Sequence, residues 1–197
     1  QNNRMEGKFV ILYSGSLGTW YLLKEMIDFF RCAKEIIKNA HFLFLTNYDH
    51  SHILNLWRKN GLSIDDLTIK STSYNGISKL MRIADCGIFF IKPLLSKRSS
   101  CPIKFAEYLA CGLPVVLNVN VGDTDTIVER NKIGVVISGF NQEEYQMCVR
   151  DLQGMMKDKD SLRNRCYNVA QSLFSLDFGV EKYYQIYRQL RGVDDEN

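Results

Sequence analysis

The sequence has no C-x-x-C pair and only three histidines, and both shortages argue against a zinc site or a disulfide framework. Its six cysteines follow no regular spacing, and most lie in apolar surroundings, as Cys86 and Cys111 do. This pattern is typical of reduced, buried thiols in a cytosolic protein. His50 and His52 are two residues apart and would point in different directions on a helix. We therefore expect no metal ion and no cofactor.

Long apolar runs and strong charge are also missing. No segment is apolar over the length needed to cross a bilayer, and no signal peptide is recognisable. The net charge of +3 over 197 residues is too small to indicate binding to nucleic acid or to a membrane surface. We expect a cytoplasmic location, with a peripheral membrane position open for the full-length protein. Gln1 is not a natural start, so we expect the chain to be a fragment.

Strand-like and helix-like patterns alternate along the chain. Continuous apolar strands that alternate with helices predict a parallel sheet covered on both faces. With right-handed crossovers this is an α/β, doubly wound, Rossmann-like domain of about six strands, spanning residues 1–191 before a disordered tail at 192–197. The expected strands are 8–13, 41–46, 67–70, 86–91, 114–117 and 133–137, and the expected helices are 20–33, 50–60, 76–84, 101–110, 124–129 and two or three between 142 and 191.

The segment Cys101–Val116 is the most informative part of the chain. Pro102 suits the first position of a helix, and Gly112 together with Pro114 provides its end. The helix is apolar almost all round, which predicts a buried position. Its only ionisable residues, Lys104 and Glu107, are three residues apart. Because an unpaired buried charge is costly, we expect them to face a ligand or each other.

This segment resembles the donor-site helix and the following strand of the GT-B glycosyltransferases, in the large retaining group that uses nucleotide-sugar donors. In that group the start of the helix holds the diphosphate, and a glutamate on the helix binds the ribose. The resemblance assigns these roles to Cys101, Ile103 and Lys104 at the helix start and to Glu107. A core helix with an incidental Lys–Glu pair is the plainer interpretation of the segment alone.

The first strand is followed by a loop with two glycines, Gly15 and Gly18. Glycines let the backbone approach a phosphate while the next helix points its positive end at it. A tight strand-to-helix turn is at least as good an explanation of this loop taken alone. The resembled family usually has an Arg and a Lys here, whereas this chain has Ser16 and Thr19.

The loop before the key helix carries Lys92, Lys97 and Arg98. Three cations near the positive end of a helix repel one another unless an anion joins them, and a diphosphate would do so. The alternative is a solvated basic loop. In the resembled family a glutamate often lies eight positions before the ribose glutamate, but here that position is Ser99. Ser99 and Ser100 are therefore the candidates near the transferred sugar.

Two further donor-site candidates follow the third strand. The resemblance places a loop near the base here, which indicates Thr72 and Tyr74. Tyr74 would stack on a base, although a tyrosine packed at a turn is the commoner outcome.

The resemblance implies a polysaccharide-biosynthesis enzyme whose donor domain is this chain. The full-length protein would transfer a sugar from a UDP-, GDP- or ADP-linked donor to a glycan or lipid-linked acceptor bound by an N-terminal domain that this chain lacks. No catalytic residue is evident, and Lys92, Lys97 and Lys104 are the candidate stabilisers of the leaving diphosphate. We expect the fragment alone to be inactive. The alternatives are a non-catalytic nucleotide-binding or regulatory Rossmann domain and a domain like a nucleotide-sugar epimerase.

Overall fold

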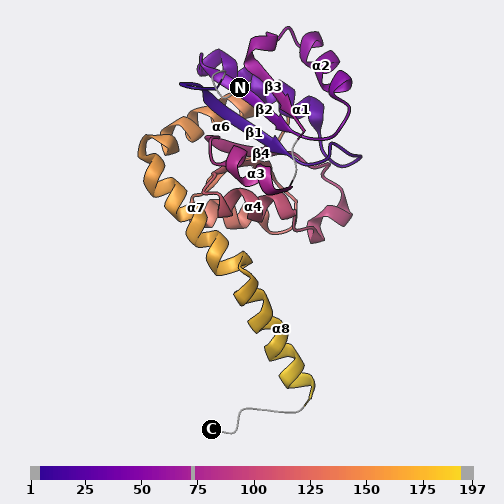
Figure 1. Cartoon of the computed structure of the whole chain (residues 1–197), viewed down its shortest axis with the longest axis vertical. Helices are drawn as coiled ribbons and strands as arrows, with labels where there is room; N and C mark the ends of the chain where they lie inside the picture. Colours follow the sequence, from indigo (N-terminus) through magenta and orange to yellow (C-terminus); the bar gives the residue numbers. More distant parts are fainter. Residues whose placement is uncertain (1–4, 72–73, 192–197) are drawn as a thin grey trace.

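A computed structural model describes residues 5–71 and 74–191. Its centre is a parallel sheet of six strands in the order β3-β2-β1-β4-β5-β6 (Figure 1). This confirms the predicted doubly wound α/β fold. The strands are β1 (Phe9–Ser14), β2 (Ala40–Leu45), β3 (Leu67–Lys70), β4 (Cys86–Phe89), β5 (Val115–Asn118) and β6 (Gly134–Ile137).

Helices cover both faces of the sheet. The chain runs outward from β1 to β3 through one set of crossovers and from β4 to β6 through another, so right-handed crossovers place the two sets on opposite faces. On one face α1 packs against α2 and α6, and on the other α4 packs against α7. The helices are α1 (Leu23–Ile36), α2 (His50–Lys59), α3 (Tyr74–Met81), α4 (Ile103–Ala110), α5 (Thr124–Asn131), α6 (Gln142–Met155), α7 (Lys159–Phe174) and α8 (Leu176–Leu190), with 3-10 turns at Ile64–Asp66, Leu95–Ser99 and Met156–Asp158.

Aromatic side chains fill the core between β2 and its covering helices. Phe42 and Phe44 project from alternate positions of β2 and stack with centroids 4.2 Å apart. Phe30 of α1 contacts both Phe42 and Trp57 of α2, with centroid separations of 5.5 and 4.8 Å. These fully buried rings fix the outer half of the sheet, so the loops at its carboxyl edge start from a rigid base.

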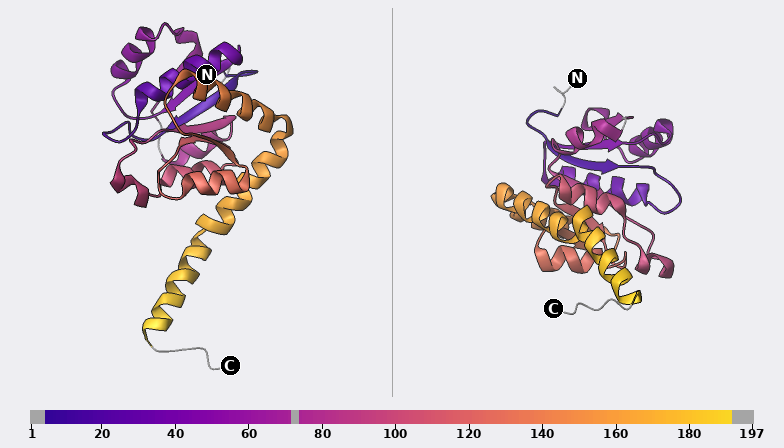
Figure 2. Two further views of the ribbon diagram at one scale, coloured as in Figure 1. Left: turned by 180° about the vertical axis from the view of Figure 1, so that it is seen from behind. Right: turned by 60° about the horizontal axis from the view of Figure 1, so that its bottom comes forward.

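The last helix, α8, is exceptional because none of its residues is buried. It projects from the body, continuing away from α7, in Figure 1 and in the left view of Figure 2. Its exposed apolar side chains include Leu176, Val180, Tyr183, Tyr187 and Leu190. Their spacing of four and three residues puts them on one face of the helix. No helix within the described residues is long and apolar enough to cross a membrane.

Two predicted boundaries are wrong for the same reason. The first helix begins at Leu23 instead of residue 20, and β4 ends at Phe89 instead of residue 91. Between these ends, Tyr21 and Ile91 form an isolated antiparallel bridge. Leu22 N–H donates to the Phe90 carbonyl at 2.9 Å, and Lys92 N–H donates to the Trp20 carbonyl at 2.9 Å. The backbone groups of residues 20–22 and 90–92 therefore pair with each other across two loops of the site, and they do not extend the helix or the strand.

Candidate functional site

The carboxyl ends of the parallel strands gather the loops that the sequence marked. In doubly wound sheets ligands bind at this edge, where the strand order reverses. Here the reversal lies between β1 and β4, so the loops after these two strands flank the expected crevice. The Tyr21–Ile91 bridge joins these two loops directly. The functional site is therefore built on loops whose backbones hold each other.

Helix α4 is placed by its aromatic residues. Phe105, Tyr108 and Leu109 are buried, and the Tyr108 ring lies against β4 at Gly87, where a Cβ would come within 2.3 Å of the ring. The Tyr108 hydroxyl accepts from Ser14 N–H at 2.8 Å. A bulkier residue than glycine in β4 would push α4 off the sheet. The end of β1 and the helix α4 are thus fixed to each other.

Two details of the α4 prediction are wrong. Pro102 is the N-cap and lies outside the helix, which begins at Ile103. The helix is also not buried all round, because Ile103 is 77% exposed and Ala110 is exposed. The predicted stop is confirmed, since Gly112 follows the helix with a φ of +69° that a glycine adopts without strain.

Lys104 is the central residue of the site. It is only 7% exposed, and its Nζ donates to the Tyr13 hydroxyl at 2.9 Å. The same nitrogen lies 4.0 Å from the Tyr13 ring centroid and 3.5 Å from that of Tyr21. We call Tyr13 and Tyr21 the aromatic cage. Lys104 takes part in none of the ion pairs among the described residues, so it does not pair with Glu107 as one interpretation expected.

The charge on Lys104 is poorly compensated inside the protein. Burial lowers the pKa of its ammonium group to about 7, and the negative charge of Glu107 offsets only part of that effect. Cation–π contacts contribute up to about 2 kcal/mol when desolvated, against a desolvation cost of several kcal/mol for a buried ion. An anion beside Nζ would remove this deficit. The position of the lysine is therefore evidence for an anionic ligand.

The lysine points at the loop after β1. An added Cβ on Gly15 would lie 3.3 Å from Lys104 Nζ, and Gly15 has a φ of +110°, in the region that favours glycine. The Tyr13 hydroxyl, which accepts from Lys104, donates to the Ser16 carbonyl at 2.8 Å. Gly15, Ser16 and Lys104 therefore come together as the sequence predicted. Gly18 lies further along this loop, where a Cβ would meet nothing within 4 Å.

The loop before α4 is braced by neighbouring strands. The Asn118 side chain accepts from Ile91 N–H at 2.8 Å and donates to the Ile91 carbonyl at 3.0 Å. Gly122 N–H donates to the Lys97 carbonyl at 2.9 Å, and a Cβ on Gly122 would come within 2.1 Å of the Ser100 carbonyl oxygen. The backbone around Lys97 and Ser100 is thus fixed by β5 and the loop after it.

The remaining predicted residues are less tightly placed. Lys97 lies with its Nζ 4.0 Å from the Trp20 ring centroid. Lys92, Arg98, Ser99 and Cys101 are exposed, and Glu107 is half-buried on α4. Thr72 lies outside the described residues, as does the side chain of Tyr74, whose backbone begins α3.

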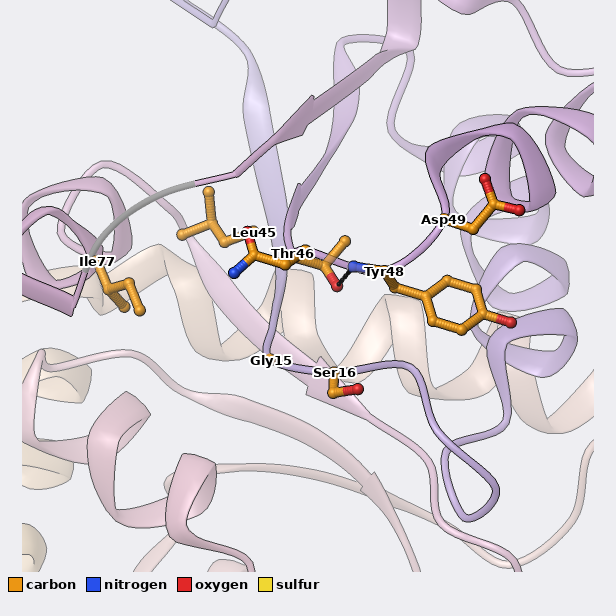
Figure 3. Close-up of a pocket in the computed structure, with 8 residues that line it drawn as sticks. Gly15, Ser16, Leu45, Thr46, Tyr48, Asp49 and Ile77 are labelled. Atoms are coloured by element: carbon orange, nitrogen blue, oxygen red, sulfur yellow. Dashed lines mark hydrogen bonds between the residues drawn. The ribbon is translucent and has the colours of Figure 1, made fainter.

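A cavity of about 430 Å³ adjoins Gly15 and Ser16 (Figure 3). The end of β2 forms its middle wall, and Tyr48 and Ile77 lie toward opposite ends of it. Thr46 Oγ1 accepts from Tyr48 N–H at 3.0 Å and so shapes the turn after β2. Asp49 accepts from Ser51 N–H at 2.9 Å as the N-cap of α2. No motif in the sequence had marked this β2 loop as part of the site.

The aromatic cage was also missed. Tyr13 is predicted only as the last residue of an apolar strand, and Tyr21 only as part of a helix. The usable signal was that a tyrosine at the buried end of a strand must find a partner for its hydroxyl. Within the described residues, no group of three His, Cys, Asp or Glu side chains is arranged to hold a metal ion.

Several solved structures share this fold. WaaG, a glycosyltransferase involved in lipopolysaccharide biosynthesis, is 18% identical, with a TM-score of 0.73 over 94% of this chain and 48% of its own. Anabaena HepE in complex with UDP-glucose is 16% identical, with a TM-score of 0.75 over 98% of this chain and 51% of its own. A TarM mutant from S. aureus, in a complex that contains UDP, is 13% identical, with a TM-score of 0.72 over 91% of this chain and 35% of its own.

This chain spans about half the length of WaaG and HepE and about a third of TarM. No curated protein matches the sequence. The family model described as "Glycosyl transferases group 1" matches residues 1–172, which is most of the chain. The fold and the α4 motif agree with that match. The chain therefore belongs to the group 1 glycosyltransferase family.

Proposed function

We propose that this domain binds a nucleoside-diphosphate sugar at the carboxyl edge of its sheet, and that the full-length protein transfers the sugar to a glycan or lipid-linked acceptor. The observation that carries the proposal is the buried Nζ of Lys104 beside Gly15, without a carboxylate partner among the described residues. A diphosphate over this loop would supply the missing negative charge. It would also lie at the amino end of α4, where helix amides favour anions.

The other parts of the donor follow from this placement. Glu107 lies one turn along α4 from Lys104, and a carboxylate there would accept hydrogen bonds from the ribose hydroxyls. Ser99, Ser100, Cys101 and Ile103 precede or open α4, beside the expected position of the transferred sugar. The cavity at the end of β2 adjoins the same loop and would accept the nucleoside, together with Thr72 and Tyr74.

Charge stabilisation would come from lysines. As the bond to the sugar breaks, negative charge develops on the leaving diphosphate, and preorganised cations stabilise that charge. Lys104 is the best placed, while Lys97 and Lys92 lie on the braced loop before α4. We propose transfer with retention and without a required metal ion. An added Cβ on Gly18 would meet nothing within 4 Å, so its part in donor binding would be limited to its backbone groups.

Calorimetric titration with UDP, GDP and ADP, with and without Mg²⁺, tests the donor site. UDP is the first choice because HepE and TarM were solved with UDP-containing ligands. We expect one nucleotide to bind, Lys104→Met to weaken it at least tenfold, and Glu107→Ala to weaken it as well. Lys59→Met, an exposed lysine at the end of α2, is the matched control. Absence of binding by all three nucleotides would contradict the proposal.

A further inference from the structure

Lys104 and its cage carry a second consequence, which rests on the proposed donor site. Tyr13 of β1 and Tyr21, just before α1, both contact the Lys104 side chain. Their rings meet edge to face with centroids 5.8 Å apart. Burial raises the pKa of both phenols, so both remain neutral hydroxyls near neutral pH. The lysine is thus surrounded by neutral groups on the side that faces β1.

The charged groups around Lys104 are few. On α4 itself, Glu107 is the only charge that acts on the ammonium group, and it favours the protonated form. From β1 and the segment before α1, the facing titratable groups are Tyr13 and Tyr21. Tyr108, one turn further along α4, is buried, and burial raises the pKa of its hydroxyl. Desolvation outweighs Glu107, and the pKa of Lys104 falls to about 7.

We propose that Tyr13 and Tyr21 are positioning residues that hold the buried Lys104 Nζ beside Gly15, where it has no carboxylate partner among the described residues, and that Lys104 takes up a proton when a donor diphosphate binds there. The proton comes from solvent and adds to Nζ, and no covalent bond of the donor changes. The cage also fixes the direction of the lysine, because the Tyr13 hydroxyl connects Nζ to the Ser16 carbonyl.

The proposal predicts a particular pH dependence of binding. Lys104 must be protonated to pair with the diphosphate. In the empty site the protonated fraction of Lys104 decreases as the pH rises above 7. Affinity should therefore fall by up to about tenfold per pH unit above pH 8 until the pKa of the bound state is reached. A lysine with an ordinary pKa near 10.4 would give no such change between pH 6 and 9.

Titration calorimetry with UDP-glucose at pH 6 to 9, in buffers of different ionisation enthalpy, measures both affinity and proton uptake. UDP-glucose is the right probe because its diphosphate has no terminal phosphate that titrates in this range. We expect uptake to approach one proton per bound ligand at pH 8 and to approach zero at pH 6. Lys104→Arg should bind without uptake, since a guanidinium stays protonated. Lys59→Met, at the end of α2, should retain the uptake.

Tyr13→Phe separates positioning from a merely structural role. It keeps the ring but removes the hydroxyl that connects Lys104 to Ser16. We expect weaker binding with a shifted pH profile, while Tyr167→Phe, an exposed tyrosine on α7, leaves the profile unchanged. Direct NMR titration of the Lys104 Cε resonance, assigned with Lys104→Met, should give a midpoint near 7 in the free protein and a higher one with UDP-glucose.

The outcomes are distinguishable. Binding of UDP-glucose with a flat pH profile and no proton uptake would overturn this inference and leave the donor site intact. An NMR midpoint near 10 in the free protein would also overturn it, whatever binds. Failure of UDP-glucose, GDP-mannose and ADP-glucose to bind at any pH would overturn the proposed function, and the inference with it.

Discussion

Gly15 and Gly18 look equivalent in the sequence, and the structure predicts opposite effects of replacing them with alanine. Gly15 has a φ of +110°, and a Cβ there would lie 3.3 Å from Lys104 Nζ. Gly18 has nothing within 4 Å of an added Cβ and no left-handed φ. The two residues lie on one exposed loop, so the comparison isolates backbone conformation and the contact with Lys104.

The expected magnitudes follow from these two conditions. A non-glycine residue in a sparsely populated φ region costs of order 1–3 kcal/mol, so Gly15→Ala should lower the unfolding free energy by about 2 kcal/mol. Gly18→Ala should change it by less, and in the stabilising direction by up to about 1 kcal/mol, because alanine restricts the unfolded chain. For binding, Gly15→Ala must displace the end of Lys104 and weaken UDP binding, whereas Gly18→Ala should leave affinity unchanged.

Urea unfolding followed by circular dichroism gives the stability difference, and calorimetry with UDP gives the affinity. Both variants should fold at 20 °C, so both measurements apply to both proteins. Equal effects of the two substitutions on stability would refute the conformational argument. Normal UDP affinity in a folded Gly15→Ala protein would refute the claim that Lys104 reaches the ligand across this position.

Three further predictions concern stability away from the site. His41 is fully buried, and burial lowers the pKa of its imidazole from the usual 6.5 to about 4. Between these two values the unfolded chain takes up a proton while the folded protein keeps His41 neutral, so stability falls as the pH falls. We expect the free energy of unfolding in urea to drop by about 2 kcal/mol between pH 7 and 5, and His41→Gln should abolish that drop. Asp85 accepts a hydrogen bond from Val10 N–H at 2.7 Å at the amino edge of the sheet. Asp85→Ala should therefore lower the free energy of unfolding by about 2 kcal/mol and leave UDP affinity intact, while Asp85→Asn should lower it less. A drop in UDP affinity in a folded Asp85 variant would contradict this prediction. Tyr183 on α8 is 67% exposed, whereas Tyr145 is buried. Tyr183→Ala should therefore change the free energy of unfolding by under about 0.5 kcal/mol, and Tyr145→Ala should lower it by about 3 kcal/mol. Similar costs for the two variants would show that α8 packs on the body in solution.

Much of the fold was predictable because a strand that is buried on both faces has a continuous run of apolar residues in the sequence. The runs at residues 41–46 and 86–91 fall on β2 and β4, the latter shortened by two residues. What failed was local. The segment around Tyr21 looks helical by its apolar spacing, but its backbone pairs with Ile91 across the site. A sequence pattern does not reveal that kind of pairing between two distant loops.

The site was predictable only in part, for a related reason. Lys104 and Gly15 each carried a local signal, but their meeting depends on the crossover geometry that brings α4 beside the end of β1. Tyr13 carried only the signal that its buried hydroxyl needs a partner, and that signal does not say which residue the partner is. Its hydroxyl matters only because Lys104 reaches it from 91 residues away in the sequence. The family match shows that the chain belongs to the group 1 glycosyltransferases, while the activity of the full-length protein and the roles of individual residues stay predictions.

The missing cations of the first loop and the buried lysine of α4 have one explanation. The resembled family usually places an Arg and a Lys after the first strand, where this chain has Ser16 and Thr19. Lys104 delivers an ammonium group to the same loop from the opposite side of the crevice. A loop lysine would be solvated and permanently charged, whereas one on α4 must pass through the core and needs the aromatic cage to reach the loop. Under the proposed proton uptake, the change of position also changes the protonation of the cation, so the absence of loop cations and the presence of Tyr13 and Tyr21 belong to a single arrangement.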